Sequence, residues 1–501
     1  MAEWPKAIAS KAIIHESVPG VRIPPSPVYR GVLKLPIKFG TDGWRAVISD
    51  EFTFENVRVV AQAIASYVNE HKLSKRGIIV GYDTRFLAEH YAEEVIKVLH
   101  ANGVICYMTD RDTPTPVVAF SVKDKKAGGA VMITASHNPP QYCGMKFIPE
   151  YAGPASSAIT EEIEKHLKGS KSSAAKTLLK IERFNPTQRY LKHLKEVIDL
   201  DAIKKAKMKI AYDPLWGTGR DYLDKILEEA GCEVFMINGF RDVLFGGITP
   251  EPIGDHLKAL KELVVKENCS AGLSTDPDAD RFGVVDEKGN YLSANLVISA
   301  LFAYLVDERG ESGSVVRSIA TTHMIDAIAE HHGVKVHETP VGFKHIAQIM
   351  LKEAVILGGE ESGGLTIGDH IPEKDGILAN LLICEMIARY KKPLSQIMKD
   401  ISNKYGHFYD KRINLKLTQS SKEALMKLLE KEPPARSAGA KLSHISKVDG
   451  IKMVFDDKSW ILARPSGTEP MIRTYYENTS ESKLKDMISD FESFVSSAIG
   501  V

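Results

Sequence analysis

The feature that most limits the fold of this chain is a strand–helix–strand order that occurs three times. In the first copy a strand at 77–83 is followed by a helix that ends at about 102 and by a strand at 104–108. The second copy has the same three elements at 208–213, 221–230 and 232–237, and the third has them at 314–316, 324–330 and 334–336. Strands that alternate with helices predict mixed or mostly parallel α/β layers.

Each copy also ends alike, with a strand of small residues followed by a polar loop. The loops contain Ser136 in the first copy, the run 276–281 in the second and the run 358–364 in the third. Because ligands of open α/β sheets bind at strand ends, three such copies can place three loops in one cleft. An ordinary α/β rhythm without true repetition is the alternative interpretation.

Regions outside the three copies suggest an arm at one end and a different domain at the other. Residues 1–36 are proline-rich and irregular, and we interpret them as an extended arm. After residue 402 the pattern becomes α+β, with strands at 412–417, 451–455 and 460–463 and helices at 422–432 and from 481 to about 497. We therefore expect domains at 37–190, 191–292, 293–402 and 403–501.

Composition excludes several classes of protein. Lys and Arg together number 65 and balance 65 Asp and Glu, so no global charge favours nucleic acid or an anionic membrane. The five scattered cysteines form no CxxC pair, which argues against a disulfide framework or structural zinc and predicts the cytoplasm. The apolar stretch 292–306 is interrupted by polar residues and is typical of a buried helix.

The first loop presents a candidate nucleophile. The apolar run 128–133 leads directly into Ser136 and His137, as expected for a buried strand that ends in a sharp turn. Folds display nucleophilic hydroxyls on such turns. A turn or cap serine is the alternative for an isolated Ser-His pair.

The second loop contains Asp276, Asp278 and Asp280 at alternate positions. In an extended segment this spacing places three carboxylates on one side, and such hard oxygen donors suit Mg²⁺. A calcium EF-hand would need glycine where Arg281 stands and helices where the flanking residues predict strands. An acidic turn without a metal is the remaining alternative.

Other loops contain residues that suit sugar phosphates. Arg464, Ser466, Gly467 and Thr468, with Arg473 beyond them, can cradle a phosphate through backbone N–H groups and guanidinium. Glu360 and Ser362 stand between glycine pairs and suit paired sugar hydroxyls, and Lys146 can transfer a proton. Considered alone, each has an ordinary alternative as a surface turn or a solvated lysine.

Taken together, these four loops resemble those of the α-D-phosphohexomutase family of phosphoglucomutases and phosphomannomutases. The resemblance runs from about Phe39 to the C-terminus, with all four loops in order. It implies an α/β fold with three similar mixed-sheet α/β/α domains around a central cleft, plus a C-terminal α+β (TBP-like) domain. It also implies an isomerase that moves a phosphoryl group within a hexose phosphate.

The resemblance assigns roles to individual residues. Ser136 would carry the phosphoryl group and, with the three aspartates, hold Mg²⁺; Arg45 and Arg281 would neighbour that group, and His137 adjoins it. Lys146 matches the family's proton-transfer lysine. Glu360 and Ser362 would bind the 3- and 4-hydroxyls of the sugar, and Lys344 and His345 are candidates for sensing which sugar is bound. Lys374 would contact the substrate phosphate. The phosphate that is not transferred would be held by Arg464, Ser466, Gly467, Thr468 and Arg473.

The implied reaction interconverts hexose 1-phosphate and hexose 6-phosphate through a 1,6-bisphosphate, which also serves as activator. The C-terminal domain would hinge to close the cleft. Many bacterial dual-specificity and glucosamine members have His where Gly364 stands, a departure that leaves the preferred sugar open. The run 342–344 looks closer to phosphoglucomutases, and for that reason glucose is favoured.

Other outcomes stay open at this point. The alternatives are a mannose, glucosamine or pentose phosphate mutase, a glucose-1,6-bisphosphate synthase, and more remotely a non-catalytic sugar-phosphate sensor. The expected partners are small sugar phosphates, with no nucleic acid or membrane, in a monomer or small homo-oligomer.

Overall fold

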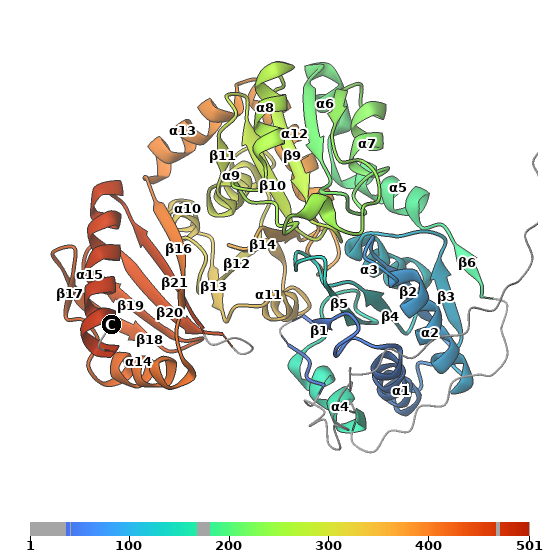
Figure 1. Ribbon diagram of the computed structural model, residues 1–501. Coiled ribbons are helices and arrows are strands. Elements are labelled where there is room, and N and C mark those ends of the chain that lie inside the picture. The colour runs from blue at the N-terminus through green and yellow to red at the C-terminus, as the bar shows by residue number, and fades with distance from the viewer. Residues whose placement is uncertain (1–36, 41, 168–180, 467–470, 500–501) are drawn as a thin grey trace, which may run out of the picture. The chain divides into compact units, whose positions relative to one another are not determined.

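The computed structural model describes residues 37–40, 42–167, 181–466 and 471–499, and within them the chain forms four sheets (Figure 1). The expected N-terminal arm at 1–36 lies outside the described residues. No helix of the described ranges is long and apolar enough to cross a membrane.

The first sheet has the strand order β1-β5-β4-β2-β3-β6. Its strands are β1 Trp44–Val47, β2 Ile78–Tyr82, β3 Cys106–Thr109, β4 Gly129–Ile133, β5 Tyr142–Pro149 and β6 Arg183–Phe184. The helices of this region are α1 Phe54–Glu70, α2 Ala88–Ala101, α3 Thr115–Lys125, α4 Ser157–Leu167, α5 Thr187–Val197 and α6 Leu200–Ala206. Both α2 and α3 pack against β2 and β4.

The second sheet has the order β11-β10-β9-β7-β8 and the third β13-β12-β14-β15. The second contains β7 Lys209–Asp213, β8 Glu233–Met236, β9 Ala271–Thr275, β10 Phe282–Asp286 and β11 Tyr291–Leu292, with helices α7 Leu223–Glu229 and α8 Lys258–Lys266 and a 3₁₀ turn at Phe245–Gly247. The third contains β12 Ser314–Ser318, β13 Val336–Thr339, β14 Val355–Glu360 and β15 Gly364–Ile367, with helices α9 Ala294–Asp307, α10 Met324–His332, α11 Phe343–Met350, α12 Gly376–Tyr390 and α13 Leu394–Tyr405.

The topology confirms the predicted repetition. In each of these three sheets the first strand of the unit pairs in parallel with the second and third, and the third pairs antiparallel with a fourth. The end of the first strand repeats as well. Asp83, Asp213 and Ser318 each accept a hydrogen bond from the backbone N–H two residues further on. Such local turns start the following loop in the same way each time.

The fourth sheet is antiparallel, in the order β16-β21-β20-β19-β18-β17. It contains β16 Tyr409–Lys416, β17 Arg436–Ser437, β18 Ala440–Ser446, β19 Ile451–Phe455, β20 Trp460–Pro465 and β21 Met471–Asn478, with helices α14 Gln419–Lys431 and α15 Glu481–Ile499. One core joins both helices to the sheet, as their positions in Figure 1 indicate. Trp460, Leu462 and Tyr475 pack instead with Ile319 and Ala320 of the third unit.

Two helices of the third unit form much of the largest core. The predicted apolar helix is α9, whose N-terminus is capped by Ser293 and whose side chains are mostly buried on all sides. Helix α12 is equally buried and is capped by Asp375, which accepts from the N–H groups of Ile377 and Leu378. A helix that is apolar all round is expected inside a large protein, so burial in this core accounts for their apolar sequences.

The largest difference from the predicted elements concerns the second strand of the third copy. We expected it at 334–336, but β13 begins at Val336, which pairs with Val315. The residues before it complete the end of α10, where Gly333 has φ 65° and the N–H of Val334 donates to the carbonyl of Ala329. A left-handed glycine cap of this kind uses the residues after a helix and delays the strand.

Candidate active site

The three polar loops occupy equivalent positions, between the third and fourth strands of each unit. The loop from β4 to β5 contains Ser136, the loop from β9 to β10 contains the aspartates, and the loop from β14 to β15 follows Glu360. Contacts join the loops although they lie far apart in the sequence. Ser136 Oγ donates to Asp276 Oδ2 at 2.7 Å, and the carbonyl of Gly363 accepts from the N–H of Phe282 at 3.0 Å, at the end of the aspartate loop. Lys374, between β15 and α12, places its Nζ 3.2 Å from Asp280 Oδ2.

Ser136 has a left-handed backbone, with φ 50°, which is uncommon for a residue with a side chain. Its N–H donates to Thr134 Oγ1 at 2.8 Å, and its Oγ lies 3.3 Å from His137 Nδ1. The side chain is buried, at 1% exposure. A strained conformation that the surroundings hold in place is typical of a functional turn.

The surroundings of His137 carry a strong positive charge. Its burial and the nearby guanidinium groups of Arg281, Arg45, Arg85 and Arg412 lower the pKa of the imidazole well below its usual value. Arg412 comes from β16 of the fourth domain. Charges that disfavour an imidazolium favour an anion at the same place, so this environment suits a phosphoryl group.

The three aspartates fit a divalent cation. Asp276, Asp278 and Asp280 are fully buried, and one ligand oxygen from each lies within 4.8 Å of the others. Oδ1 of Asp278 and Oδ1 of Asp280 accept no hydrogen bond from any described residue. Burial and the other two carboxylates raise the pKa of Asp276 well above its usual value. A bound cation would satisfy these oxygens and offset the repulsion, and Mg²⁺ prefers such ligands.

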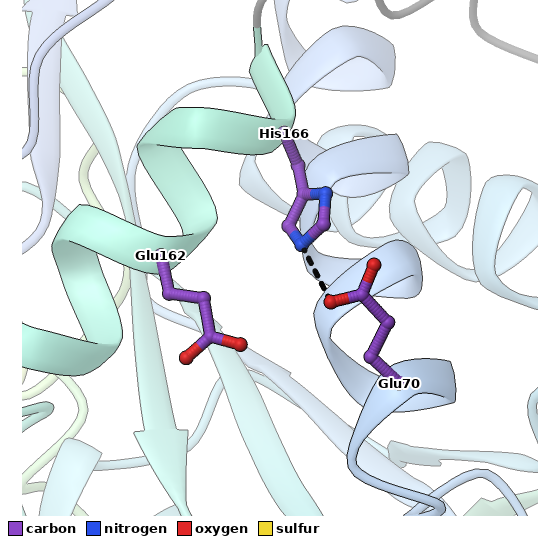
Figure 2. Close-up of side chains that lie close together, drawn as sticks. All are labelled: Glu70, Glu162 and His166. Carbon is purple, nitrogen blue, oxygen red and sulfur yellow. Dashed lines mark ion pairs between the residues drawn. The ribbon is translucent and has the colours of Figure 1, made fainter.

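A second group of possible metal ligands differs from the aspartates. Glu70, Glu162 and His166, between α1 and α4, also bring three ligand atoms within 4.8 Å of one another (Figure 2). Here, however, His166 pairs with Glu70 at 3.3 Å and His71 pairs with Glu162 at 2.7 Å. The Glu70 side chain is 59% exposed. Surface ion pairs therefore account for this group.

Two buried lysines lie beside the aspartates. Lys146 Nζ lies 3.0 Å from Asp278 Oδ2, 3.0 Å from Asp280 Oδ2 and 2.9 Å from Asp42 Oδ2, and Lys374 Nζ lies 3.3 Å from Asp42 Oδ2. Burial opposes a charged amine, but the carboxylates outweigh it and raise the pKa of Lys146 well above its usual value. The amine is therefore protonated in this arrangement, which is the form that a general acid requires.

Arg45 and Arg281 also lie at this site. Arg45 Nη1 donates to Asn138 Oδ1 at 2.8 Å, next to the serine turn. The N–H of Arg281 donates to Asp276 Oδ1 at 3.1 Å, and its side chain lies 3.7 Å from Glu251 Oε1. The Arg281 guanidinium also lies near the aspartates, with Nε 3.9 Å from Asp280 Oδ1. Both side chains are therefore close to the serine turn or the aspartate loop.

The third loop brings a carboxylate close to the residues expected to sense the sugar. Glu360 Oε1 accepts from the N–H of Gly342 at 2.6 Å, immediately before α11. Burial, and then the charge of Glu361, raise the pKa of Glu360 to about 7. Ser362, Lys344 and His345 are half-buried, and the last two lie in the first turn of α11. Burial and Lys344 lower the pKa of His345.

A pH dependence of stability follows from Glu360. Because its pKa rises from 4.5 to about 7 in the folded protein, the folded state binds more protons than the unfolded state between about pH 4.5 and 7. The contribution of Glu360 to the free energy of unfolding is therefore lost as the pH rises through this window. We expect Glu360→Gln to gain stability relative to the wild type across that window in urea-denaturation measurements.

The control for this comparison is Glu338→Gln. Although burial opposes it, Lys452 and Arg317 lower the pKa of Glu338, so its stabilising effect is lost only as the pH falls below about 4.5. Its stability difference from the wild type should stay level from pH 5 to 7. A level difference for Glu360→Gln as well would contradict the raised pKa of Glu360.

One aspartate joins the expected phosphate loop to the segment before α11, next to the residues expected to sense the sugar. Asp449 Oδ2 accepts from Arg464 Nε at 2.7 Å and from the N–H of Val341 at 3.0 Å. Arg464 is also the cross-strand partner of Arg473 in β20 and β21. Like charges at directly opposite positions are unfavourable without an anion between them. Ser466 is buried at the end of this strand, whereas Gly467 and Thr468 lie outside the described residues.

The sequence interpretation missed several residues of this site. Asp42 contacts both lysines. Burial would raise the pKa of its carboxyl group, but the charges of Lys146, Lys374 and Arg45 outweigh this effect and lower the pKa. Thr115, at the start of α3, donates from its Oγ1 to Asp278 Oδ2 at 2.7 Å. The only available signal was that Asp42 stands in the same short motif as Arg45. The neighbouring residues do not indicate that Asp42 contacts two lysines far away in the sequence.

Comparisons with known proteins agree with this geometry. Family models described as phosphoglucomutase/phosphomannomutase match residues 36–174 (alpha/beta/alpha domain I), 188–289 (domain II), 294–405 (domain III) and 413–493 (C-terminal domain). Together they span most of the chain.

Individual relatives match along nearly their whole length. A phosphoglucomutase/phosphomannomutase of Thermococcus kodakarensis is 32% identical over 456 residues, covering 90% of this chain and 96% of the relative. A phosphoglucosamine mutase of Clostridium acetobutylicum is 30% identical, covering 90% and 96%. A solved structure from Thermus thermophilus has 31% identity and a TM-score of 0.82, covering 92% of this chain and 99% of that one.

A Paramecium phosphoglucomutase structure, at 22% identity and a TM-score of 0.77, covers 93% of this chain and 96% of its own and shares the fold. The repeated units, the aligned loops and these matches lead to one conclusion. The chain belongs to the phosphoglucomutase/phosphomannomutase family, the α-D-phosphohexomutases, and is an isomerase of that family.

Proposed function

We propose that this enzyme interconverts glucose 1-phosphate and glucose 6-phosphate, that Ser136 carries the phosphoryl group, and that glucose 1,6-bisphosphate is both intermediate and activator. The main support is the contact of Ser136 Oγ with Asp276 Oδ2 at 2.7 Å, because it places a hydroxyl at a buried group of three carboxylates. The positive charges around His137 add a favourable environment for phosphate.

Asp276, Asp278 and Asp280, with the phosphorylated Ser136, would hold Mg²⁺, which would neutralise charge on the transferring group. In the first transfer the bond from phosphorus to Ser136 Oγ breaks and a bond to the sugar 6-hydroxyl oxygen forms. The net proton movement is from that hydroxyl to Ser136 Oγ. Lys146, a protonated amine beside the aspartates, would give a proton to the serine oxygen and recover one from the sugar.

The second transfer reverses these bonds at the other end of the sugar. After the 1,6-bisphosphate has reversed its orientation in the site, Ser136 Oγ takes the 1-phosphoryl group and the 6-phosphate remains on the sugar. Arg464, Arg473 and Ser466 would hold whichever phosphate is not transferred, while Glu360 and Ser362 would bind the sugar hydroxyls. The bridge from Arg464 through Asp449 to Val341 supports their action as one substrate-binding unit.

The preference for glucose rests on the run 342–344, which looks closer to phosphoglucomutases and adjoins Glu360 through the N–H of Gly342. At Gly364, an added Cβ atom would lie 2.4 Å from Cδ of Lys374, so a larger residue there would displace the lysine that pairs with Asp42 and Asp280. Glucosamine 1-phosphate is the second candidate, since phosphoglucosamine mutases of 28–30% identity are among the relatives.

A substrate panel tests this preference. With Mg²⁺ and the matching bisphosphate present, we expect kcat/KM for glucose 1-phosphate to exceed the values for mannose, glucosamine and ribose 1-phosphates. Specific hydrogen bonds to sugar hydroxyls can discriminate by on the order of 10-fold or more. A more than about tenfold advantage for ribose or glucosamine 1-phosphate would reject glucose, and no turnover of any sugar phosphate would favour a sensor.

We also propose that the enzyme acts in the cytoplasm, as a monomer or small homo-oligomer, on free sugar phosphates. All five cysteines are free, and four of them are buried, as suits a reducing compartment. The balanced formal charge supports small anionic substrates over nucleic acid or membrane surfaces.

A further inference from the structure

We propose that Arg85 is a positioning residue, which holds the turn of Ser136 in its left-handed conformation and ties it to the domain of the metal-binding aspartates. The proposal rests on the proposed role of Ser136 as phosphoryl carrier. The guanidinium of Arg85 donates to backbone carbonyls of the serine loop, so beyond its share of the positive charge around His137, it acts on the reaction through that backbone.

The guanidinium of Arg85 is fully buried under this loop. Its Nη2 donates to the carbonyl oxygens of Ser136 at 2.6 Å and Asn138 at 2.5 Å, and its Nη1 donates to those of Pro139 and Tyr142, each at 2.9 Å. One rigid planar group thus satisfies four carbonyls of a single turn. Lysine has one donor atom on a flexible stem and cannot reproduce this geometry.

Asp83 completes the arrangement from the other side. Its Oδ2 lies 3.3 Å from Arg85 Nε and accepts from Thr134 Oγ1 at 2.6 Å. The same Thr134 oxygen accepts from the N–H of Ser136 at 2.8 Å. Both backbone polar groups of Ser136 are therefore held, its N–H through Thr134 and its carbonyl by Arg85. The side chain is directed to Asp276, to which its Oγ donates.

The second domain holds Arg85 in turn. The Phe245 ring, which is fully buried, has its centroid 5.0 Å from Arg85 Cζ. Arg241 donates from Nη2 to the carbonyl of Arg85 and from Nε to that of Thr84, each at 3.0 Å. Both residues belong to the segment between β8 and α8, in the unit whose β9–β10 loop contains Asp276. The serine turn is thus attached through Arg85 to the domain that contains the aspartate loop.

Hydrogen exchange tests this role without any substrate. In Arg85→Lys and Phe245→Leu we expect amides of residues 134–142 to exchange at least about tenfold faster, since local opening becomes easier. The matched control is Arg111→Met, because Arg111 also joins the first two domains, pairing with Asp221 at 2.5 Å, whereas its side-chain ion pairs within the described ranges do not involve the serine loop. Its exchange at 134–142 should equal that of the wild type.

Kinetics distinguish positioning from binding. Misplacing a reacting group by about 1 Å costs on the order of 10²-fold in rate, so kcat of Arg85→Lys should fall at least about tenfold while KM changes by less than about threefold. Phe245→Leu should lie between Arg85→Lys and the wild type, and Arg111→Met should match the wild type.

The proposal fails if both variants keep wild-type exchange at 134–142, or if KM rises while kcat is unchanged. If Arg85→Lys does not fold, the same comparison is made with Phe245→Leu. If the wild type turns over no sugar phosphate, the proposed function fails, whereas the exchange comparison still decides whether Arg85 holds the turn.

Discussion

Ser136→Ala is expected to lower mutase turnover on the order of 10³-fold or more, because removing a nucleophile eliminates the covalent route rather than weakening it. The hydroxyl contacts Asp276 Oδ2 and lies 3.3 Å from Nδ1 of His137, the residue surrounded by positive charges. Alanine should also abolish the mass increase of about 80 Da that one phosphoryl group gives on treatment with the bisphosphate. Coupled assay and intact-mass measurement check the two effects together.

The matched control is Ser299→Ala. Ser299 is another fully buried serine, but its Oγ donates to the carbonyl of Asn295 within α9 and not to a carboxylate of the site. Its removal should alter stability without altering phosphorylation or turnover. Near-normal turnover in Ser136→Ala would mean that another group carries the phosphoryl group, and the proposed mechanism would be wrong.

Removing the metal is expected to give the second large effect. Treatment with EDTA should lower turnover by about 100-fold or more, and added Mg²⁺ should restore it, since a cation supplies several kcal/mol of charge stabilisation in phosphoryl transfer. Asp280→Asn should lose a similar factor even at high Mg²⁺. Its Oδ1 has no hydrogen-bond donor among the described residues and is available to a metal, whereas its Oδ2 pairs with Lys146 and Lys374.

Asp286→Asn provides the control for this experiment. Asp286 is a buried carboxylate at the other end of β10, where it accepts from the N–H groups of Lys288 and Asn290 in a turn. Its replacement should leave the Mg²⁺ requirement as in the wild type. If Asp280→Asn kept full activity and the same Mg²⁺ dependence, the aspartates would not hold the metal that the reaction uses.

Much of the architecture could be predicted from local patterns. The buried strands before Ser136, Asp276 and Glu360 consist of small and apolar residues, and each is followed by a polar turn. Such patterns depend on neighbours in the chain, so they survive without knowledge of the tertiary structure. The boundary of β13 was missed because a glycine helix cap and a strand start compete for the same residues, and only pairing with Val315 settles the start.

The residues of the candidate site also differ in how far the sequence predicts them. Sequence patterns indicated the hydroxyl of Ser136, the carboxylates and the arginine loop, because each of these motifs consists of residues close together in the chain. They did not identify Asp42 or Arg85. Asp42 belongs to the site because it forms ion pairs with Lys146 and Lys374. Arg85 matters because it donates hydrogen bonds to four carbonyl groups of another loop.

By itself, then, the sequence determined the repeated α/β unit, the loop that ends each copy and the kind of chemistry each loop offers. Only the tertiary structure decided which loops meet, that Ser136 Oγ contacts Asp276, and that Lys374 reaches Asp280. The physical reason is range. Strand periodicity and turn chemistry are set by neighbouring residues, whereas contacts between loops depend on how separate sheets pack and bury charges that must then find partners.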